Sequence, residues 1–224
     1  MIGKNWLVIL LTKNSMQLVG LGEEKVQTLA IPGTIISNME VTSKDGLYTL
    51  ITNWLGHRPH TGAEIIWILA PDICFEHVIT STEQAKIDSE TLQFLDTVPF
   101  EEVLSRVYKP LEWRLIIAVN KDLVMSMIQG FILHSYLTKA VIPGKVIQAD
   151  VVLTQEIAQN AVKHASELGR ESLVAAPSPI VPTLSELAGS STSESKPKSQ
   201  LSLLLGVFGV LLVILMVVLL FSNR

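Results

Sequence analysis

Histidine and cysteine are the side chains of this 224-residue chain best suited to metal binding or nucleophilic catalysis. His57 and His60 stand three residues apart, a spacing that metal sites can use. No cysteine or carboxylate cluster lies near them to complete four ligands, so an exposed loop is the favoured interpretation. The other three histidines have no readable partner and are interpreted as core or surface residues: His77, His134 and His164.

Cys74 and His77 could form a nucleophilic pair only if both side chains reached the same surface. The apolar run of residues 74–79 predicts a strand, in which residues three apart point to opposite faces. A thiol in apolar sequence also behaves as a small hydrophobe. We therefore expect no such pair. Because Cys74 is the only cysteine, an intrachain disulfide is excluded and a reducing compartment is favoured.

Carboxylates are numerous between residues 88 and 102, but they stand in charge-mixed, loop-like sequence that is typical of an acidic surface: Asp88, Glu90, Asp96, Glu101 and Glu102. The chain contains no GxGxxG, GxxxxGK[ST] or GxSxG motif. The sequence therefore predicts a protein that is not an enzyme, with no catalytic, cofactor-binding or metal site. The alternative is a membrane-tethered hydrolase, whose pocket would gather His57, His60 or His77 with carboxylates.

Residues 201–221 are apolar apart from Ser202 and two glycines, and only Ser222-Asn-Arg224 follows them. About 20 such residues span a hydrocarbon core roughly 30 Å thick, and a soluble core helix would keep a polar face. We therefore predict a single transmembrane helix that contacts the lipid bilayer through residues 201–221. A homodimer through this helix is possible, although Gly206 and Gly209 stand closer than the GxxxG spacing.

The charges that flank this segment favour one orientation. Lys196 and Lys198 precede it and Arg224 follows it, so the positive-inside bias places the N-terminal domain in the cytoplasm. The apolar run Trp6–Leu11 is too short for a signal-peptide core and reads as a buried strand. The expected location is the inner (cytoplasmic) membrane of a bacterium.

Composition divides the chain into three parts. Residues 1–170 are long enough for one α/β (α+β) domain with a substantial core. Residues 171–200 are rich in proline and serine, which predicts a flexible linker before the membrane helix. The formal net charge is −4, and no basic run suggests nucleic acid as a partner.

Within the domain, periodicity and turn residues predict an alternation of strands and helices. The expected strands are residues 6–11, 16–21, 26–31, 64–69, 74–79, 113–120, 138–142 and 146–153. Residues 80–90 are polar and are predicted to form a loop. The expected helices are residues 45–55, capped by Ser43 or Asp45; 123–137, capped by Asp122; and 154–168, capped by Thr154.

This order of elements resembles that of a known group. The features that carry the resemblance are the hairpin of residues 7–21, the turn Ile31-Pro-Gly33 and the passage Leu115-Ile-Ile-Ala-Val-Asn-Lys-Asp-Leu-Val124. It resembles the N-terminal half of the actin-like proteins of type IV pilus and type II secretion assembly, the PilM and GspL group. The resemblance covers residues 5–168 and implies a truncated actin-like (ribonuclease H-like) domain. It also implies an inserted αβαβ subdomain at about residues 95–145, with a helix at 100–106.

The chain departs from this group in two respects. Nucleotide-binding members carry an acidic, glycine-bearing hairpin turn whose amides face the phosphates, whereas this chain has Thr12-Lys-Asn-Ser15. The second half, which supplies the other wall of the nucleotide cleft, is replaced by the predicted linker and membrane helix. The resemblance therefore implies neither ATP binding nor any other cofactor.

The resemblance implies a membrane-anchored, non-catalytic scaffold of a type IV pilus or type II secretion-like platform. Its partners would be pilus or secretion inner-membrane proteins, held through sheet edges and through the subdomain. Aromatic residues there are candidate contacts, although such residues are more often core: Phe94, Phe100 and Tyr108. A generic tail-anchored adaptor with an unrelated α/β fold is a further alternative.

Overall fold

The computed structural model describes residues 6–21, 23, 25–56, 62–109, 114–148 and 152–174. His57, His60, most of the predicted linker and the whole predicted membrane helix lie outside these residues. Within the described part, no helix has both the length and the apolar composition needed to cross a bilayer. The division into domain, linker and membrane helix stays a prediction.

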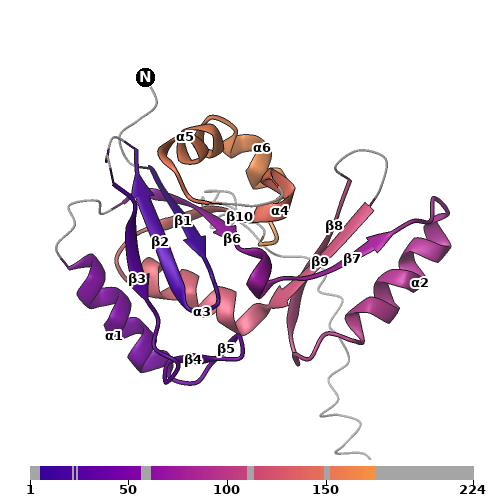
Figure 1. Cartoon of the computed structure of the whole chain (residues 1–224), viewed down its shortest axis with the longest axis horizontal. Helices are drawn as coiled ribbons and strands as arrows, with labels where there is room; N and C mark the ends of the chain where they lie inside the picture. Colours follow the sequence, from indigo (N-terminus) through magenta and orange to yellow (C-terminus); the bar gives the residue numbers. More distant parts are fainter. Residues whose placement is uncertain are drawn as a thin grey trace, which may run out of the picture. The chain divides into compact units, whose positions relative to one another are not determined.

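A five-stranded sheet forms the centre of the fold, in the order β10-β6-β1-β2-β3 (Figure 1). Its strands are β1 (Trp6–Leu11), β2 (Ser15–Gly20), β3 (Gln27–Ala30), β6 (Glu64–Leu69) and β10 (Leu137–Pro143). Strands β10, β6 and β1 are parallel, and β1, β2 and β3 form an antiparallel meander. The predicted hairpin and the predicted central strand 64–69 are therefore confirmed.

Both faces of this sheet are covered by helices, which explains why β6 is apolar at consecutive positions. Trp67 of β6 belongs to the core on the side of α1 (Lys44–Leu55) and α3 (Lys121–Ile132), where its ring lies 5.0 Å from that of Phe131. Ile66 and Ile68 belong to the core on the side of α5 (Gln155–Lys163) and α6 (Ala165–Arg170). Figure 1 shows these two helix layers on opposite sides of the sheet.

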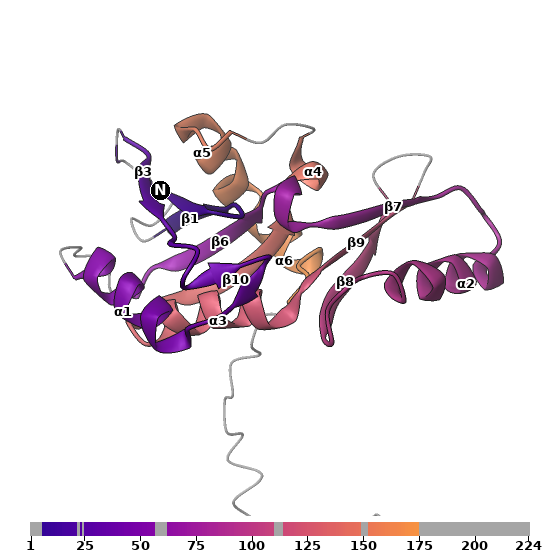
Figure 2. The same cartoon turned by 60° about the horizontal axis from the view of Figure 1, so that its bottom comes forward.

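A smaller antiparallel sheet has the order β7-β9-β8. It consists of β7 (Phe75–Ile79), β8 (Val103–Tyr108) and β9 (Arg114–Asn120), and α2 (Gln84–Leu95) packs on one of its faces (Figure 2). Ile79, Ile87 and Ile116 form the core under α2. The other face of β9 contributes Leu115, Ile117 and Val119 to the larger core. The remaining short elements are β4 (Ile36–Ser37), β5 (Glu40–Val41), η1 (Pro71–Ile73) and α4 (Gly144–Ile147).

The structure confirms the mixed α/β class and corrects several predicted elements. Residues 80–90 are not a loop, since α2 begins at Gln84; this surface helix buries only Ile87, so its apolar signal is weak. The predicted helix 100–106 is wrong, because β8 pairs along β9 there. The predicted strand 146–153 is also wrong at its start, where α4 ends at Ile147.

The insert differs from the expected αβαβ unit at residues 95–145. The smaller sheet and α2 span residues 75–120 in the order β-α-β-β, while α3 and β10 belong to the larger sheet and its helix layer. Ser43 and Thr154 cap α1 and the 155–163 helix as predicted. The predicted helix 154–168 is divided into α5 and α6 at His164.

Candidate functional site

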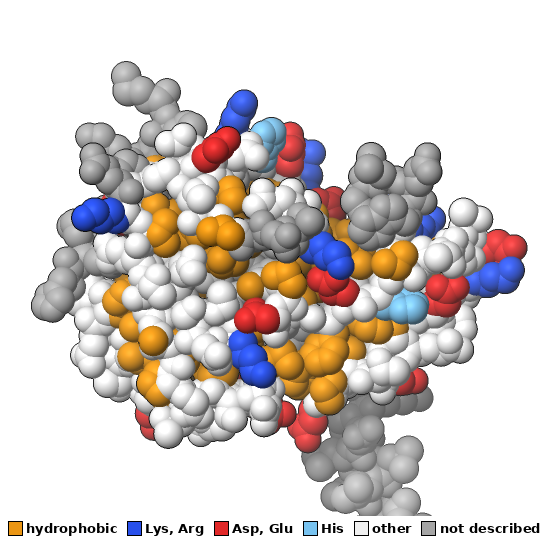
Figure 3. Space-filling view, viewed as in Figure 1, with side chains coloured by type: hydrophobic (Ala, Val, Ile, Leu, Met, Phe, Trp, Pro, Cys, Tyr) orange, Lys and Arg blue, Asp and Glu red, His pale blue; other side chains and the backbone are white. Residues whose placement is uncertain are grey.

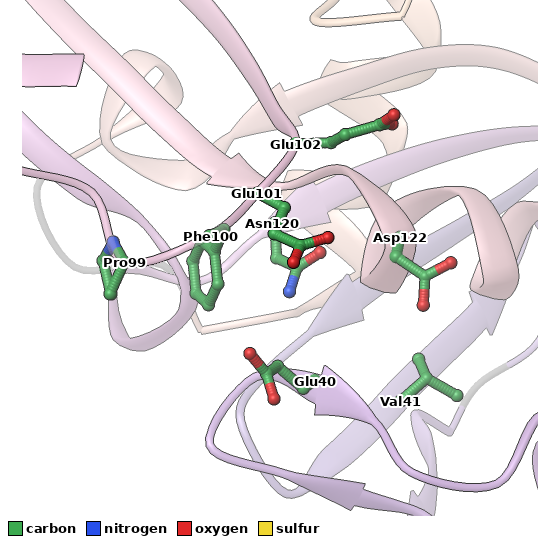
Figure 4. Close-up of a pocket in the computed structure, with 8 residues that line it drawn as sticks. All are labelled: Glu40, Val41, Pro99, Phe100, Glu101, Glu102, Asn120 and Asp122. Atoms are coloured by element: carbon green, nitrogen blue, oxygen red, sulfur yellow. The ribbon is translucent and has the colours of Figure 1, made fainter. Parts of the chain in front are cut away.

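An open pocket of about 540 Å³ lies between β5, the loop before β8 and the start of α3 (Figure 4). Its lining comes from three segments far apart in the sequence: Glu40, Val41, Pro99, Phe100, Glu101, Glu102, Asn120 and Asp122. Half of these residues are carboxylates, and Phe100 supplies an apolar wall. The pocket therefore combines negative charge with a smaller apolar surface.

Asn120 forms the floor of the pocket because β9 passes directly into α3 at this residue. Its side-chain Oδ1 accepts a hydrogen bond from the Leu123 N–H at 3.2 Å, which caps α3. The residue is only 6% exposed. The predicted cap, Asp122, instead lies in the first turn, where a carboxylate also interacts favourably with the helix dipole.

Two of the four pocket carboxylates are neutralised by lysines at its rim. Lys44 of α1 pairs with Asp122 at 2.6 Å, and Lys121 pairs with Glu102 at 2.7 Å. The hydrogen bond with Asp122 raises the pKa of Lys44.

The other two carboxylates, Glu40 and Glu101, form no ion pair with any described residue. They line the same opening as the Asn120 amide (Figure 4). The pocket thus keeps a net negative charge, and a cationic group is the ligand that it fits. Among the described residues, no group of three or more His, Cys, Asp or Glu side chains is placed to hold a metal ion.

A tight hairpin brings Glu40 to the pocket. Ser37 pairs with Glu40 across β4 and β5, so only Asn38 and Met39 form the turn. Both have positive φ, at 52° and 63°, as a type I′ turn requires. Asparagine tolerates this conformation, whereas methionine adopts it rarely. Met39 packs against the main core, and this contact holds the hairpin in position.

A second feature concerns the turn between β1 and β2, where nucleotide-binding actin-like proteins present amides to phosphates. Here the Lys13 N–H donates to Asp72 Oδ2 of η1 at 3.0 Å. Thr12 and Ser15 close the rest of the turn through their own hydroxyl groups. The Asp72 carboxylate therefore already accepts from one backbone amide of this turn.

Cys74 and His77, which were not expected to form a nucleophilic pair, have separate environments. Cys74 precedes β7 and packs against the main core, and burial raises the pKa of its thiol. His77 is exposed and stacks on Phe94, with ring centroids 5.6 Å apart. His134 Nε2 lies 2.9 Å from Thr52 Oγ1, and His164 Nδ1 lies 3.0 Å from Glu167 Oε2 of α6.

Of the three aromatic residues considered as contacts, only Phe100 lines the pocket, where its ring lies 5.5 Å from that of Phe75. Tyr108 is a core residue at 3% exposure, and Phe94 packs against the smaller core. Sequence reasoning missed Glu40 and Asn120. The polar residue that ends an apolar strand could have indicated Asn120, but nothing in the sequence pointed to Glu40.

Charge is dispersed over the visible face of the molecule in Figure 3. On the face shown in Figure 3, lysine and arginine side chains stand apart from one another and next to acidic ones. That face therefore offers no continuous basic area of the kind that binds nucleic acid.

Comparisons with known proteins found similar solved structures only. No protein-family model matches the chain, and no curated protein matches it. The structure is similar to that of the PilM-PilN type IV pilus biogenesis complex, with 11% identity and a TM-score of 0.48 over 62% of this chain and 47% of that one. It is also similar to the cytoplasmic domain of EpsL, an inner-membrane component of the type II secretion system of Vibrio cholerae. That match has 13% identity and a TM-score of 0.40 over 62% of this chain and 57% of that one.

A third similar structure is a Bacteroides thetaiotaomicron protein with an actin-like ATPase fold and unknown function, at 11% identity and a TM-score of 0.35. The match covers 61% of this chain and 52% of that one. The chain thus spans about half the length of the structures that it matches. Two of these three structures come from type IV pilus and type II secretion proteins, the group that the sequence resembles.

Proposed function

We propose that this chain is a membrane-anchored, non-catalytic scaffold, which holds partner proteins of a type IV pilus or type II secretion-like platform at the cytoplasmic face of the inner membrane. The observation that carries the proposal is the pocket around the buried Asn120, in which Glu40 and Glu101 form no ion pair with another described residue. A basic segment of a partner protein fits it, because a lysine or arginine would pair with both carboxylates while an apolar neighbour packs on Phe100.

The sequence supports anchoring of such a scaffold. Residues 201–221 have the length and composition of a bilayer-spanning helix, and residues 171–200 have those of a linker. Confinement within tens of ångströms of a membrane would raise the effective concentration for membrane-bound partners to roughly the millimolar range. A pocket with a low affinity for its partner would then suffice, because the anchor keeps the domain close to membrane-bound partners.

The turn between β1 and β2 supports a non-catalytic role. Asp72 accepts from the Lys13 amide, so a nucleotide phosphate would have to displace a carboxylate at this turn. The kind of platform follows from the resemblance of residues 5–168 to the pilus and secretion group. We propose that this chain has a partner protein that binds it as PilN binds PilM in their complex.

The test is a pull-down of the tagged full chain from gently solubilised native membranes, with mass spectrometry of the recovered proteins. The pocket variant E40K/E101K reverses both unpaired charges. The control variant E156K/E167K makes the same change of charge on α5 and α6, on the opposite side of the larger sheet. We expect the wild type and the control to recover inner-membrane pilus or secretion proteins, and the pocket variant to recover at least tenfold less.

Two results would overturn the proposal. Equal recovery by the pocket variant and the control would show that the pocket does not bind the partner. If the wild-type bait is intact and abundant but recovers no inner-membrane protein, the proposed scaffold function is wrong.

A further inference from the structure

A four-residue segment, residues 171–174, leads from the end of α6 to the last described residue, and we call it the strap. Arg106 of β8 holds its beginning. The guanidinium donates from Nη2 to the carbonyl of Arg170 at 2.7 Å and from Nη1 to the carbonyl of Ser172 at 3.1 Å. One side chain of the smaller sheet thus bonds to the backbone carbonyls on either side of Glu171.

Tyr108 adds a second clamp from the same face of β8, two residues further along. Its hydroxyl donates to the carbonyl of Glu171 at 3.1 Å. Burial raises the pKa of this phenol, so it stays a donor throughout the physiological range. The Arg106 guanidinium also lies 6.0 Å from the centroid of the Tyr108 ring, within the range of a cation–π contact.

The other side of the strap lies on β10, the edge strand of the larger sheet. The Leu173 N–H donates to the carbonyl of Val141 at 2.9 Å, and the Val141 N–H donates to Ser172 Oγ at 2.9 Å. Ser172 is only 4% exposed, and its hydroxyl donates to the carbonyl of Val174 at 2.6 Å. The strap therefore covers part of an edge that would otherwise expose unpaired backbone groups.

We propose that the strap is a releasable latch, which joins β8 of the smaller sheet to the edge of β10 and opens without unfolding either sheet. When it is closed, residues 171–174 lie against β8 and β10. When it is open, these residues leave both strands and the β10 edge at Val141 is exposed.

The nature of the contacts makes local release the expected behaviour. Two backbone N–H groups of the strap bond to the rest of the domain: that of Glu171 completes the last turn of α6, and that of Leu173 donates to β10. The other hydrogen bonds between the strap and the described residues involve a side chain, and the Leu173 and Val174 side chains pack against the main core. The ion pair of Arg106 with Glu171 spans 3.4 Å, and its two side chains are 37% and 53% exposed, so it contributes little. A few such bonds are weak beside the cooperative unfolding of a domain.

Hydrogen exchange of the full chain in detergent micelles, read by mass spectrometry, tests the latch. Arg106→Gln removes the guanidinium clamp, and Tyr108→Phe removes one hydroxyl with little change of shape. Glu171→Gln is the matched control, because it removes only the exposed ion pair and keeps the carbonyl that accepts from Tyr108.

We expect the first two variants to raise the exchange rate at least tenfold in the strap and in the outer edges of β8 and β10, with β1 and β6 unchanged. The control should exchange like the wild type. A similar rise in every strand would show that the strap is part of one cooperative unit, and no rise in any segment would show that these contacts hold nothing; either result overturns the proposal.

Discussion

The side chain of Asn120 caps the helix that begins at the next residue, with its Oδ1 atom 3.2 Å from the backbone nitrogen of Leu123. This hydrogen bond satisfies one of the amides that the first turn of a helix leaves without a partner. It also fixes the place where the central strand of the smaller sheet turns into α3. Since Asn120 lines the acidic pocket as well, the same residue sets the fold and the site at this junction.

Substitution of the cap should destabilise the domain more than substitution of its acidic neighbour. We expect Asn120→Ala to lower the free energy of unfolding by about 1–2 kcal/mol, because a buried amide loses its acceptor. Asp122→Ala should cost less than about 1 kcal/mol, since its pair with Lys44 is exposed. Urea titration followed by circular dichroism measures both. Asn120→Ser, which keeps a capping oxygen, should recover most of the loss, and a larger cost for Asp122→Ala would contradict the assignment of the cap.

The contact between α1 and α3 depends on the absence of a side chain at Gly130. A β-carbon there would lie 2.5 Å from Cδ1 of Ile51, which is fully buried. Overpacking of this kind costs about 1–3 kcal/mol, whereas alanine gains about 1 kcal/mol over glycine in a helix. We therefore expect Gly130→Ala to lower the urea midpoint.

A double variant separates overpacking from other effects at this contact. Ile51→Val removes the Cδ1 atom and alone should cost about 0.5–1.5 kcal/mol. If Cδ1 is the obstacle, G130A/I51V should be more stable than the sum of the single costs predicts. Strict additivity, or a stabilising Gly130→Ala, would refute the role of the contact.

The indole N–H of Trp67 is a buried polar group in the larger sheet, and its hydrogen bond can be tested by mutation. Its Nε1–H donates to Thr138 Oγ1 of β10 at 3.2 Å, while the residue is only 1% exposed. Thr138→Val has nearly the same shape but leaves the indole N–H without this acceptor, so we expect a loss of about 1–3 kcal/mol in unfolding free energy. Thr138→Ser keeps the hydroxyl and should lose less. Equal costs for the two variants would show that the hydrogen bond contributes nothing.

Stability should fall as the pH rises above neutrality. Burial raises the pKa of the Cys74 thiol and of the Tyr108 phenol, so the folded state holds both protons to higher pH than the unfolded state does. Their contribution is complete below the unfolded pKa values, about 8.5 and about 10, and is lost as the pH rises through and beyond them. Urea midpoints from pH 7 to pH 10.5 measure the loss. Cys74→Ala should flatten the decline between pH 8 and pH 10, and an unchanged slope would argue against the thiol as a cause.

The elements that the sequence predicted correctly are those with a strong local signal. The run Glu64–Leu69 is apolar at consecutive positions because both of its faces are buried, and helices start after Ser43 and Thr154 because these hydroxyls accept from the first turn. Two of the elements that it missed are β8 of the smaller sheet and α2, which packs on that sheet. There α2 buries a single residue, Ile87, and β8 has only one fully buried side chain, so neither shows a clear period.

The pocket could not be predicted because its residues are brought together only by packing. Glu40 is carried by a hairpin with an unusual turn, Glu101 by a loop, and Asn120 by a strand-to-helix junction. Each is an ordinary polar residue within its own segment. They line one opening because the chain passes from the larger sheet to the smaller one after β6 and returns to the larger one through α3.

The sequence by itself determined the α/β class, the hairpin, the central strand and two of the helix caps, because periodicity and capping act over a few neighbouring residues. The prediction of a membrane anchor at residues 201–221 rests on the same kind of local pattern. Only the tertiary structure decided the extent of the smaller sheet, the acidic pocket and the strap. These depend on contacts such as Arg106 with Ser172, between residues more than sixty positions apart, and no local pattern specifies which distant partner a side chain meets.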